Sequence, residues 1–282
     1  MQRRHLLISL TTTLLPATMH AAEPGRAPLV QTLSTPGELP LLLTVPHDGE
    51  AFIGLPPART RGTVLRDLGT RPLAEQTALA LARLTGGQRP ALVVALAHRR
   101  YVDVNRSEAE GTESDDAVPA WRSYHAEVAA QVADLRKRFP NGALMVDVHG
   151  QGQVPDTIFR GTRNGQTARA LIKRLGPVAL QGPHSLTGEL AARGYTVAPL
   201  MQDTLSAEDP RFSGGHTVAT YGSHQPEGID AIQLEFGSAL RQRQARLPDD
   251  LAAALLAFMR YAGYLPANVS ARQRSSPGRL TA

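Results

Sequence analysis

The chain of 282 residues contains no cysteine. This absence excludes a disulfide framework, an iron–sulfur cluster, a thiol nucleophile and any zinc site built on cysteine ligands. A metal ion in this protein must therefore be held by histidine and carboxylate side chains. Since 42% of the residues are hydrophobic and 20% are charged, the chain can bury a large core and is not disordered or fibrous.

Lysine is almost absent, because it occurs only at Lys137 and Lys173, and nearly all the positive charge is arginine. The 30 basic and 25 acidic residues give a net charge of +5, which is a small excess. No stretch combines clustered arginines with aromatic residues, so the composition does not indicate a nucleic-acid-binding protein. Arginine favours bidentate binding of carboxylate or phosphate groups. We therefore expect a small-molecule substrate and no nucleic acid.

Several common active-site motifs are also missing. The sequence has no Gly-x-Ser-x-Gly elbow, which argues against a serine hydrolase of that type. It has no Gly-x-Gly-x-x-Gly and no Gly-x-x-x-x-Gly-Lys loop, and so no nucleotide-binding motif.

The first 22 residues have the pattern of an export signal. Arg3 and Arg4 give a basic start, Leu6 to Leu15 is mostly apolar, and the small residues Ala21 and Ala22 follow. The apolar run is too short to span a bilayer. We predict a signal peptide at 1–22, with an amphipathic first helix as the alternative. Export by the general secretory or the twin-arginine route then gives a periplasmic or secreted protein with no membrane segment.

The rest of the chain alternates short apolar runs with helical patterns. The runs have the length of buried strands and are Leu41 to Val45, Ala91 to Ala97, Ala143 to Val148 and Ile229 to Phe236. The helical patterns are Pro72 to Leu84, Pro119 to Phe139, Thr167 to Leu175 and Asp249 to Tyr261. This order predicts a three-layer α/β/α fold, with helices on both faces of a mainly parallel, mixed sheet. We expect one domain over 23–265 and a flexible tail at 266–282.

Polar residues follow these runs, at the carboxyl ends of strands where ligands bind in such sheets. His47 and Glu50 form a His-x-x-Glu pattern after the first run, and His149 follows the third. Two histidines and a carboxylate are a ligand set of catalytic zinc, with a fourth position for water. The sequence therefore predicts one zinc ion per chain at these three residues, with structural loop histidines as the alternative.

Two further carboxylates lie within the strand runs. Asp147 is on the same strand face as His149 and can hydrogen-bond its second ring nitrogen or a nearby backbone amide, or else pair with an arginine. Glu235 lies near the end of a core strand, where a carboxylate is costly without a partner or a task. Beside zinc it can act as general base and then as general acid. We predict Glu235 as the catalytic residue, with a surface glutamate on an edge strand as the alternative.

Candidate substrate-binding residues follow the second run and precede the last one. Arg100, Asn105 and Arg106 can hold a substrate carboxylate and set its scissile bond over the metal, unless the arginines are structural. His216 and Tyr221 follow a glycine pair and can donate a hydrogen bond to an oxyanion. A mobile surface loop is the alternative for that second segment.

Five motifs occur in order between about residue 41 and residue 237. They are Val45-Pro46-His47-Asp48-Gly49, Arg100 to Arg106, Asp147-Val148-His149-Gly150, Phe212-Ser213-Gly214-Gly215 and Ala231 to Glu235. This series resembles that of the N-formylglutamate amidohydrolase family. The resemblance implies the fold of the zinc carboxypeptidases and a zinc-dependent amidohydrolase, which cleaves the amide of an N-formyl or other N-acyl amino acid through metal-activated water. It implies the roles given above for His47, Glu50, His149 and Glu235, and it makes Asn105 and Arg106 carboxylate binders.

Two features depart from the family pattern. Gly150 replaces the serine of the family's Asp-x-His-Ser motif, which we expect to change the surroundings of the third ligand or the pocket wall. Most relatives that degrade formylglutamate are cytoplasmic, whereas this chain begins with an export signal. We therefore expect another N-acylated amino acid, a peptide or a cell-wall fragment as substrate. The alternatives are an exported zinc carboxypeptidase or peptidoglycan amidopeptidase of the same fold, and a non-catalytic periplasmic binding protein.

Overall fold

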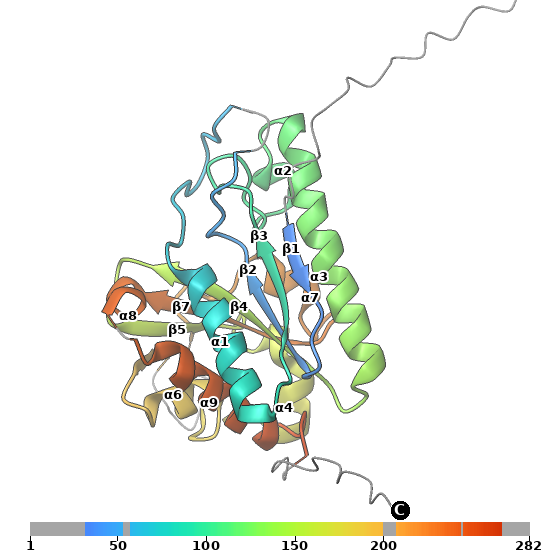
Figure 1. Ribbon diagram of the computed structural model, residues 1–282, viewed down its shortest axis with the longest axis vertical. Helices are drawn as coiled ribbons and strands as arrows, with labels where there is room; N and C mark the ends of the chain where they lie inside the picture. Colours follow the sequence, from blue (N-terminus) through green and yellow to red (C-terminus); the bar gives the residue numbers. More distant parts are fainter. Residues whose placement is uncertain (1–31, 53–56, 200–206, 244, 267–282) are drawn as a thin grey trace, which may run out of the picture.

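The computed structural model describes residues 32–52, 57–199, 207–243 and 245–266 (Figure 1). At their centre lies a seven-stranded sheet with the order β1-β3-β2-β4-β7-β5-β6. The strands are β1 (Thr32–Thr35), β2 (Leu41–Val45), β3 (Ala91–Ala95), β4 (Leu144–Gln151), β5 (Thr157–Gly161), β6 (Thr196–Ala198) and β7 (Asp230–Gly237). Strands β3, β2, β4 and β7 are parallel to one another, as are β5 and β6, whereas the β1–β3 and β5–β7 pairs are antiparallel. The prediction of a mainly parallel, mixed sheet is confirmed.

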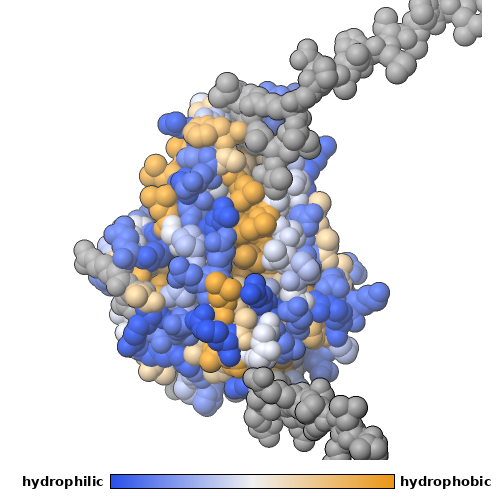
Figure 2. All heavy atoms as spheres, viewed as in Figure 1, coloured by the Kyte–Doolittle hydropathy of each residue, from blue (hydrophilic) through white to orange (hydrophobic). Residues whose placement is uncertain are grey.

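Helices cover both faces of this sheet and form the two outer layers (Figure 1). Helices α1, α6 and α9 pack on one face, and α3 packs on the other. The helices are α1 (Thr70–Thr85), α2 (Glu108–Gly111), α3 (Val118–Arg138), α4 (Arg169–Leu175), α5 (Val178–Gln181), α6 (Leu186–Ala191), α7 (His216–Tyr221), α8 (Ser238–Arg243) and α9 (Leu247–Tyr261), with 3₁₀ turns at Asp115–Ala117 and Gln166–Ala168. Figure 2 shows apolar side chains between α1 and α3, and over the segment that precedes α1.

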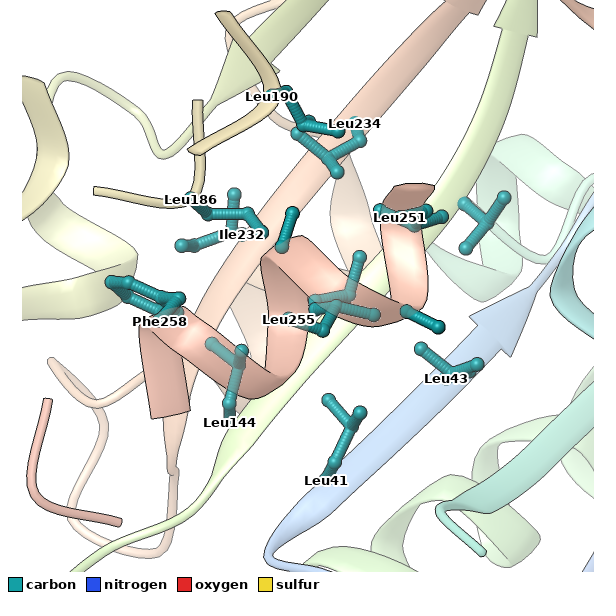
Figure 3. Packing of buried hydrophobic residues seen from close by; sticks show 14 of the residues in the cluster. Leu41, Leu43, Leu144, Leu186, Leu190, Ile232, Leu234, Leu251, Leu255 and Phe258 are labelled. Carbon is teal, nitrogen blue, oxygen red and sulfur yellow. The ribbon is translucent and has the colours of Figure 1, made fainter. Parts of the chain in front are cut away.

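The central strands are apolar throughout because both of their faces are covered. In β2, Leu41 and Leu43 belong to the core under α1 and α9, whereas Leu42 between them belongs to the core under α3. Figure 3 shows Leu255 of α9 close to Leu41 and Leu43, so that the helix closes the first of these cores. The parallel strands are thereby fixed in register, and the chain segments that follow them meet at one edge of the sheet.

The four predicted strands correspond to β2, β3, β4 and β7, and the four predicted helices correspond to α1, α3, α4 and α9. The sequence analysis did not predict β1, β5 and β6 as strands. Strand β1 has four partly exposed residues and β6 has only three residues, so neither carries a recognisable periodicity.

The two ends of the chain extend beyond the described residues. The predicted signal peptide at 1–22 lies outside them, and so does all but the first residue of the predicted tail at 266–282. Within the described ranges, no helix is both long enough and apolar enough to cross a membrane.

Candidate active site

A cavity of about 710 Å³ opens where the carboxyl ends of β2, β4 and β7 meet. His47 follows β2, while His149 lies on β4 with Glu235 of β7 as its direct neighbour in the parallel ladder. All three side chains line the cavity. The pairing of β4 with β7 therefore places the third predicted ligand beside the predicted catalytic carboxylate.

Three ligand atoms converge at the base of this cavity. The Nδ1 atoms of His47 and His149 lie 3.1 Å apart, and Oδ2 of Asp67 lies 3.2 Å from each of them. All three side chains are buried. The atoms form a nearly equilateral triangle around a single point.

Carboxylates behind the two histidines fix which ring nitrogen carries the hydrogen. Nε2 of His47 lies 2.7 Å from Oδ1 of Asp103, and Nε2 of His149 lies 2.9 Å from Oδ2 of Asp147. An ionised carboxylate only accepts hydrogen bonds, so each Nε2 must donate, and each Nδ1 is left with a free lone pair. The proposed contact between Asp147 and the second ring nitrogen of His149 is therefore present.

The three converging lone pairs are arranged as the ligands of a metal ion would be. Two imidazole nitrogens and a carboxylate oxygen in close contact repel one another unless a cation lies between them. Zn–N and Zn–O bonds of about 2.0–2.2 Å in a tetrahedron put neighbouring ligand atoms roughly 3.3–3.5 Å apart, close to the separations here. The donor set of two nitrogens and one oxygen also suits zinc, and it leaves a fourth position open towards the cavity.

The electrostatics of the metal-free protein lead to the same conclusion. Burial by itself lowers the pKa of His149, but Asp147, Asp67 and Glu235 more than offset it and raise the pKa well above its usual value. Burial by itself raises the pKa of Asp67, yet His47 and His149 hold that pKa well below its usual value. The cluster therefore stabilises positive charge at its centre, which a bound divalent cation would supply.

Asp67 was not predicted from the sequence. It lies just before α1, and its backbone N–H donates to the carbonyl of His47 at 3.1 Å. Asp48 holds this segment in place, since its Oδ2 accepts hydrogen bonds of 3.0 Å from the backbone amides of Gly69 and Arg71 at the start of the helix. An acidic residue before a helix is usually interpreted as a cap, and Asp67 follows no strand, so neither sequence rule identified it as a ligand.

Glu50, which was predicted as the second ligand, does not reach the cluster. The backbone of Ala51 pairs with the chain just after β3, through a bridge to Ala97 and a hydrogen bond to Leu96. This pairing directs the Glu50 side chain outward, where it is 76% exposed and bonds Arg66 at 2.8 Å. The prediction of Glu50 in this cluster is therefore wrong, and Asp67 occupies the place expected for it.

Glu235 lies beside the cluster and is nearly buried. Its Oε1 is 3.9 Å from Nδ1 of His149 and accepts a hydrogen bond of 3.0 Å from Nε2 of Gln233. Gln233 is held in turn by the backbone N–H of Gly215, which donates to its Oε1 at 2.7 Å. Burial raises the pKa of Glu235, with His149 acting in the opposite direction. The carboxylate is thus oriented towards the ligand atoms and is more basic than an exposed glutamate.

Two of the predicted substrate-binding residues line the cavity. Asn105 is buried, and its Oδ1 accepts a hydrogen bond of 2.8 Å from the backbone N–H of Thr217. Its Nδ2 faces Nε2 of His149 at 3.2 Å, and the two atoms are both donors when Nε2 carries the hydrogen. Arg106 is exposed to the cavity, and its guanidinium makes no hydrogen bond or ion pair within the described part of the chain. Arg106 is therefore free to bind a substrate, whereas the amide oxygen of Asn105 is occupied by the backbone of Thr217.

Three other predicted substrate-binding residues lie away from this cavity. Arg100 is exposed and is not part of its lining. The ring of His216 contacts those of Trp121 and His125, and the Tyr221 hydroxyl bonds Nδ1 of His125 at 3.0 Å. Because His216 and Tyr221 pack between α3 and α7 and Arg100 lies outside the lining, the structure does not support these three residues as direct substrate contacts.

Sequence and structure comparisons point to one family. A sequence model of the N-formylglutamate amidohydrolases matches residues 117–241. No curated protein matches the chain. Similar solved structures include an N-formylglutamate amidohydrolase from Ralstonia eutropha, with 19% identity and a TM-score of 0.56 over 83% of this chain and 98% of that one. A gene product of Agrobacterium tumefaciens shares 15% identity, with a TM-score of 0.51 over 82% of this chain and 93% of that one.

These likenesses agree with the motif series read from the sequence. At 19% and 15% identity the solved structures establish the fold, and the family match covers the segment that carries His149 and Glu235. Over residues 117–241 the chain is therefore similar to the N-formylglutamate amidohydrolases, a family of amide hydrolases.

Proposed function

We propose that this protein is a zinc-dependent amidohydrolase that cleaves the amide bond of a small N-acylated amino acid or a similar anionic substrate. The observation that carries the proposal is the convergence of lone pairs from His47, Asp67 and His149 beside Glu235. One zinc ion per chain at these residues would act as a Lewis acid and lower the pKa of a water molecule to about 7. Proton transfer and substrate binding are assigned to side chains of the protein itself.

Glu235 is the group placed to move protons. It accepts a proton from the water that attacks the amide carbonyl, and it donates this proton to the departing amine nitrogen. Its position next to His149 keeps it within reach of both events, and the hydrogen bond from Gln233 restricts its orientation. Burial raises its pKa, which favours proton uptake in the first step.

The charge of the cavity favours an anionic substrate. Five arginines contribute to its lining, namely Arg66, Arg99, Arg106, Arg211 and Arg241. Three of them are paired with carboxylates, as Arg66 is with Asp48. Arg106 has no carboxylate at ion-pair distance among the described residues and can bind a substrate carboxylate through two parallel hydrogen bonds. Leu65 and Leu68 are 74% and 62% exposed at the cavity, and they offer an apolar surface to the rest of the substrate.

Metal content and hydrolysis measured on the same samples test this proposal. Elemental mass spectrometry of the purified protein should find one zinc per chain, and His149→Ala should lose both the metal and the activity. Glu235→Gln should keep the metal but lose several orders of magnitude in turnover, because the geometry is preserved and proton transfer is not. A panel of N-formyl and N-acyl amino acids and short peptides then identifies the substrate.

Two results would contradict the proposal. Wild-type protein without stoichiometric metal under zinc-replete conditions would reject the ligand set and favour a binding protein. Near-normal turnover in Glu235→Gln would reject the role of that carboxylate. Cleavage of peptides or cell-wall fragments, with none of the N-acyl amino acids, would favour the carboxypeptidase or amidopeptidase alternative.

We also propose that the protein acts outside the cytoplasm, on the basis of the sequence of residues 1–22. Cell fractionation with N-terminal sequencing of the recovered protein tests this point. Processed protein in the periplasm or medium supports export, whereas unprocessed protein in the cytosolic fraction rejects it. Export makes cytoplasmic formylglutamate an improbable substrate and favours N-acylated compounds met outside the cell membrane.

A further inference from the structure

Gly150 allows an arginine side chain to cross the end of β4. A Cβ atom at this position would lie 2.4 Å from Cζ of Arg241 and 2.7 Å from its Nε. Gly150 is part of a regular strand and has no positive φ angle, so its backbone does not require glycine. A side chain at Gly150 would therefore require the guanidinium of Arg241 to move from this position.

Arg241 connects three chain segments at the edge of the cavity. Its Nε donates to the carbonyl of Phe236 at 3.0 Å, its Nη2 donates to the carbonyl of Gln151 at 3.2 Å, and its Nη1 donates to the carbonyl of Leu68. Phe236 follows Glu235, Leu68 follows Asp67, and Gln151 is two residues beyond His149. One planar group thus holds the segments that supply two metal ligands and the catalytic carboxylate.

These contacts differ from those of the neighbouring arginines. Arg66, Arg99 and Arg211 form ion pairs with acidic residues, whereas Arg241 has no carboxylate at ion-pair distance within the described part of the chain. Its guanidinium is held by backbone carbonyls that lie far apart in the sequence. Since a guanidinium has N–H groups in fixed directions, it can hold three carbonyls in one arrangement.

We propose that Gly150 and Arg241 act as a pair, in which the missing side chain admits the guanidinium and the guanidinium fixes Asp67, His149 and Glu235 relative to one another. Arg241 is then a positioning residue that acts through the backbone of these three segments. This inference rests on the proposed metal site. It explains why glycine follows the third ligand in this chain.

A double-mutant cycle tests the pair. Gly150→Ala should displace the flexible end of Arg241 without disturbing the fold, and Arg241→Ala should remove the clamp. Each variant should weaken zinc binding by at least tenfold in a chelator competition, the size expected for loss of groups that orient metal ligands. Gly150→Ala should have little further effect in the Arg241→Ala background, because the clash is then gone.

Two further variants separate shape from charge. Arg241→Lys retains the positive charge but concentrates its donors at one point, so it should fail to restore zinc affinity. Gly152→Ala is the matched control, because a Cβ there meets no atom within 4 Å, and its zinc affinity should equal that of wild type. Additive effects of Gly150→Ala and Arg241→Ala, or wild-type affinity in Arg241→Lys, would overturn the proposal.

A measurement on metal-free protein keeps this proposal distinct from the proposed function. Amide hydrogen exchange near Asp67, Gly150 and Phe236 should be faster in both single variants, and no faster in the double variant than in Arg241→Ala. Unchanged exchange in Arg241→Ala would reject the clamp even if zinc binds. If wild type binds no zinc but both single variants still exchange faster than wild type, the clamp is retained and only the metal site is rejected.

Discussion

The two histidines can act as metal ligands because acidic residues lie behind them. Asp103 and Asp147 accept from the Nε2 atoms of His47 and His149, and this leaves the Nδ1 lone pairs to face Asp67. Asp147 was predictable from strand alternation, since it lies two residues before His149 on the same face. Asp103 lies on a loop, where no periodicity relates its direction to that of His47, and its role became visible only in the structure.

Asp67 and Glu50 offer a direct test of the ligand set at the level of single residues. Asp67→Ala should reduce zinc from one per chain to a small fraction of that, because the Oδ2 atom 3.2 Å from both histidines is lost. Glu50→Ala should retain the metal, since that side chain is 76% exposed. Elemental analysis of both variants decides between the two carboxylates, and metal loss in Glu50→Ala with retention in Asp67→Ala would reverse the assignment.

His125 should make the stability of the metal-free protein depend on pH. Burial and the charge of His216 lower its pKa, the hydrogen bond to Val104 and the charges of Asp147 and Glu108 raise it, and the net pKa is about 4 instead of the usual 6.5. Between these two pH values, His125 is therefore protonated in the unfolded chain but neutral in the folded protein. Above pH 6.5 His125 does not reduce the free energy of unfolding. As the pH falls towards 4, its protonation in the unfolded chain lowers that free energy by about 3 kcal/mol in all.

Urea unfolding of metal-free wild type and His125→Gln at pH 7 and pH 4.5 measures this pH-dependent contribution of His125 to the free energy of unfolding. The free energy of unfolding should fall more steeply with decreasing pH in wild type than in the variant, because glutamine cannot take up a proton. Other groups titrate equally in both proteins, so the difference between the two slopes isolates His125. Equal slopes would show that His125 does not contribute.

At the level of secondary structure, the site depends on the parallel pairing of long, buried strands. The pairing of β4 with β7 places His149 beside Glu235, and that of β2 with β4 places Thr44 beside Asp147. These strands were predictable because each is an apolar run covered on both faces. The residues around Asp67, just before α1, have no such pattern, and they are held by hydrogen bonds that the backbone amides of Gly69 and Arg71 donate to Asp48.

The loop before α7 is attached to β5 by a buried ion pair that the sequence analysis did not identify. Oε1 of Glu208 lies 2.9 Å from Nε of Arg160, and Oε2 accepts from the backbone amides of Thr162 at 2.7 Å and Asn164 at 2.9 Å. Both partners are almost completely buried. Glu208 thus fixes the start of the segment that leads to Gly215, which in turn holds Gln233 behind Glu235.

Glu208→Ala should therefore destabilise the protein and misplace this loop. Removal of one member of a buried ion pair leaves an uncompensated charge and typically costs about 3–5 kcal/mol in the free energy of unfolding. Asp209→Ala is the control, because it removes the neighbouring surface ion pair with Arg211 and should cost much less. Denaturant unfolding measures the free energy of unfolding that each variant loses. Equal losses in the two variants would show that the buried ion pair contributes no more to stability than the surface pair.

On the scale of the whole molecule, the structure explains why arginine and not lysine lines the cavity. Three arginines that line the same cavity, Arg66 before α1, Arg99 after β3 and Arg241 of α8, are held by carboxylates or carbonyls in fixed directions. A lysine ammonium group would not maintain these several contacts. The composition predicted arginine-based anion binding, but only the tertiary fold determines that Arg106 is free while Arg66, Arg99 and Arg241 are engaged.

Metal binding should couple to the stability of the entire fold, because the three ligands come from segments around residues 47, 67 and 149 that meet only in the folded protein. Free zinc at 1,000 times its Kd should stabilise the native state by about 4 kcal/mol, and raise Tm by roughly 10 °C. Thermal unfolding with zinc and with a chelator measures this shift in wild type and in Asp67→Ala. The variant should show almost no shift, since it lacks one corner of the triangle. A shift of equal size in Asp67→Ala would mean that the stabilising ion binds elsewhere, and the cluster would then need another explanation for its converging lone pairs.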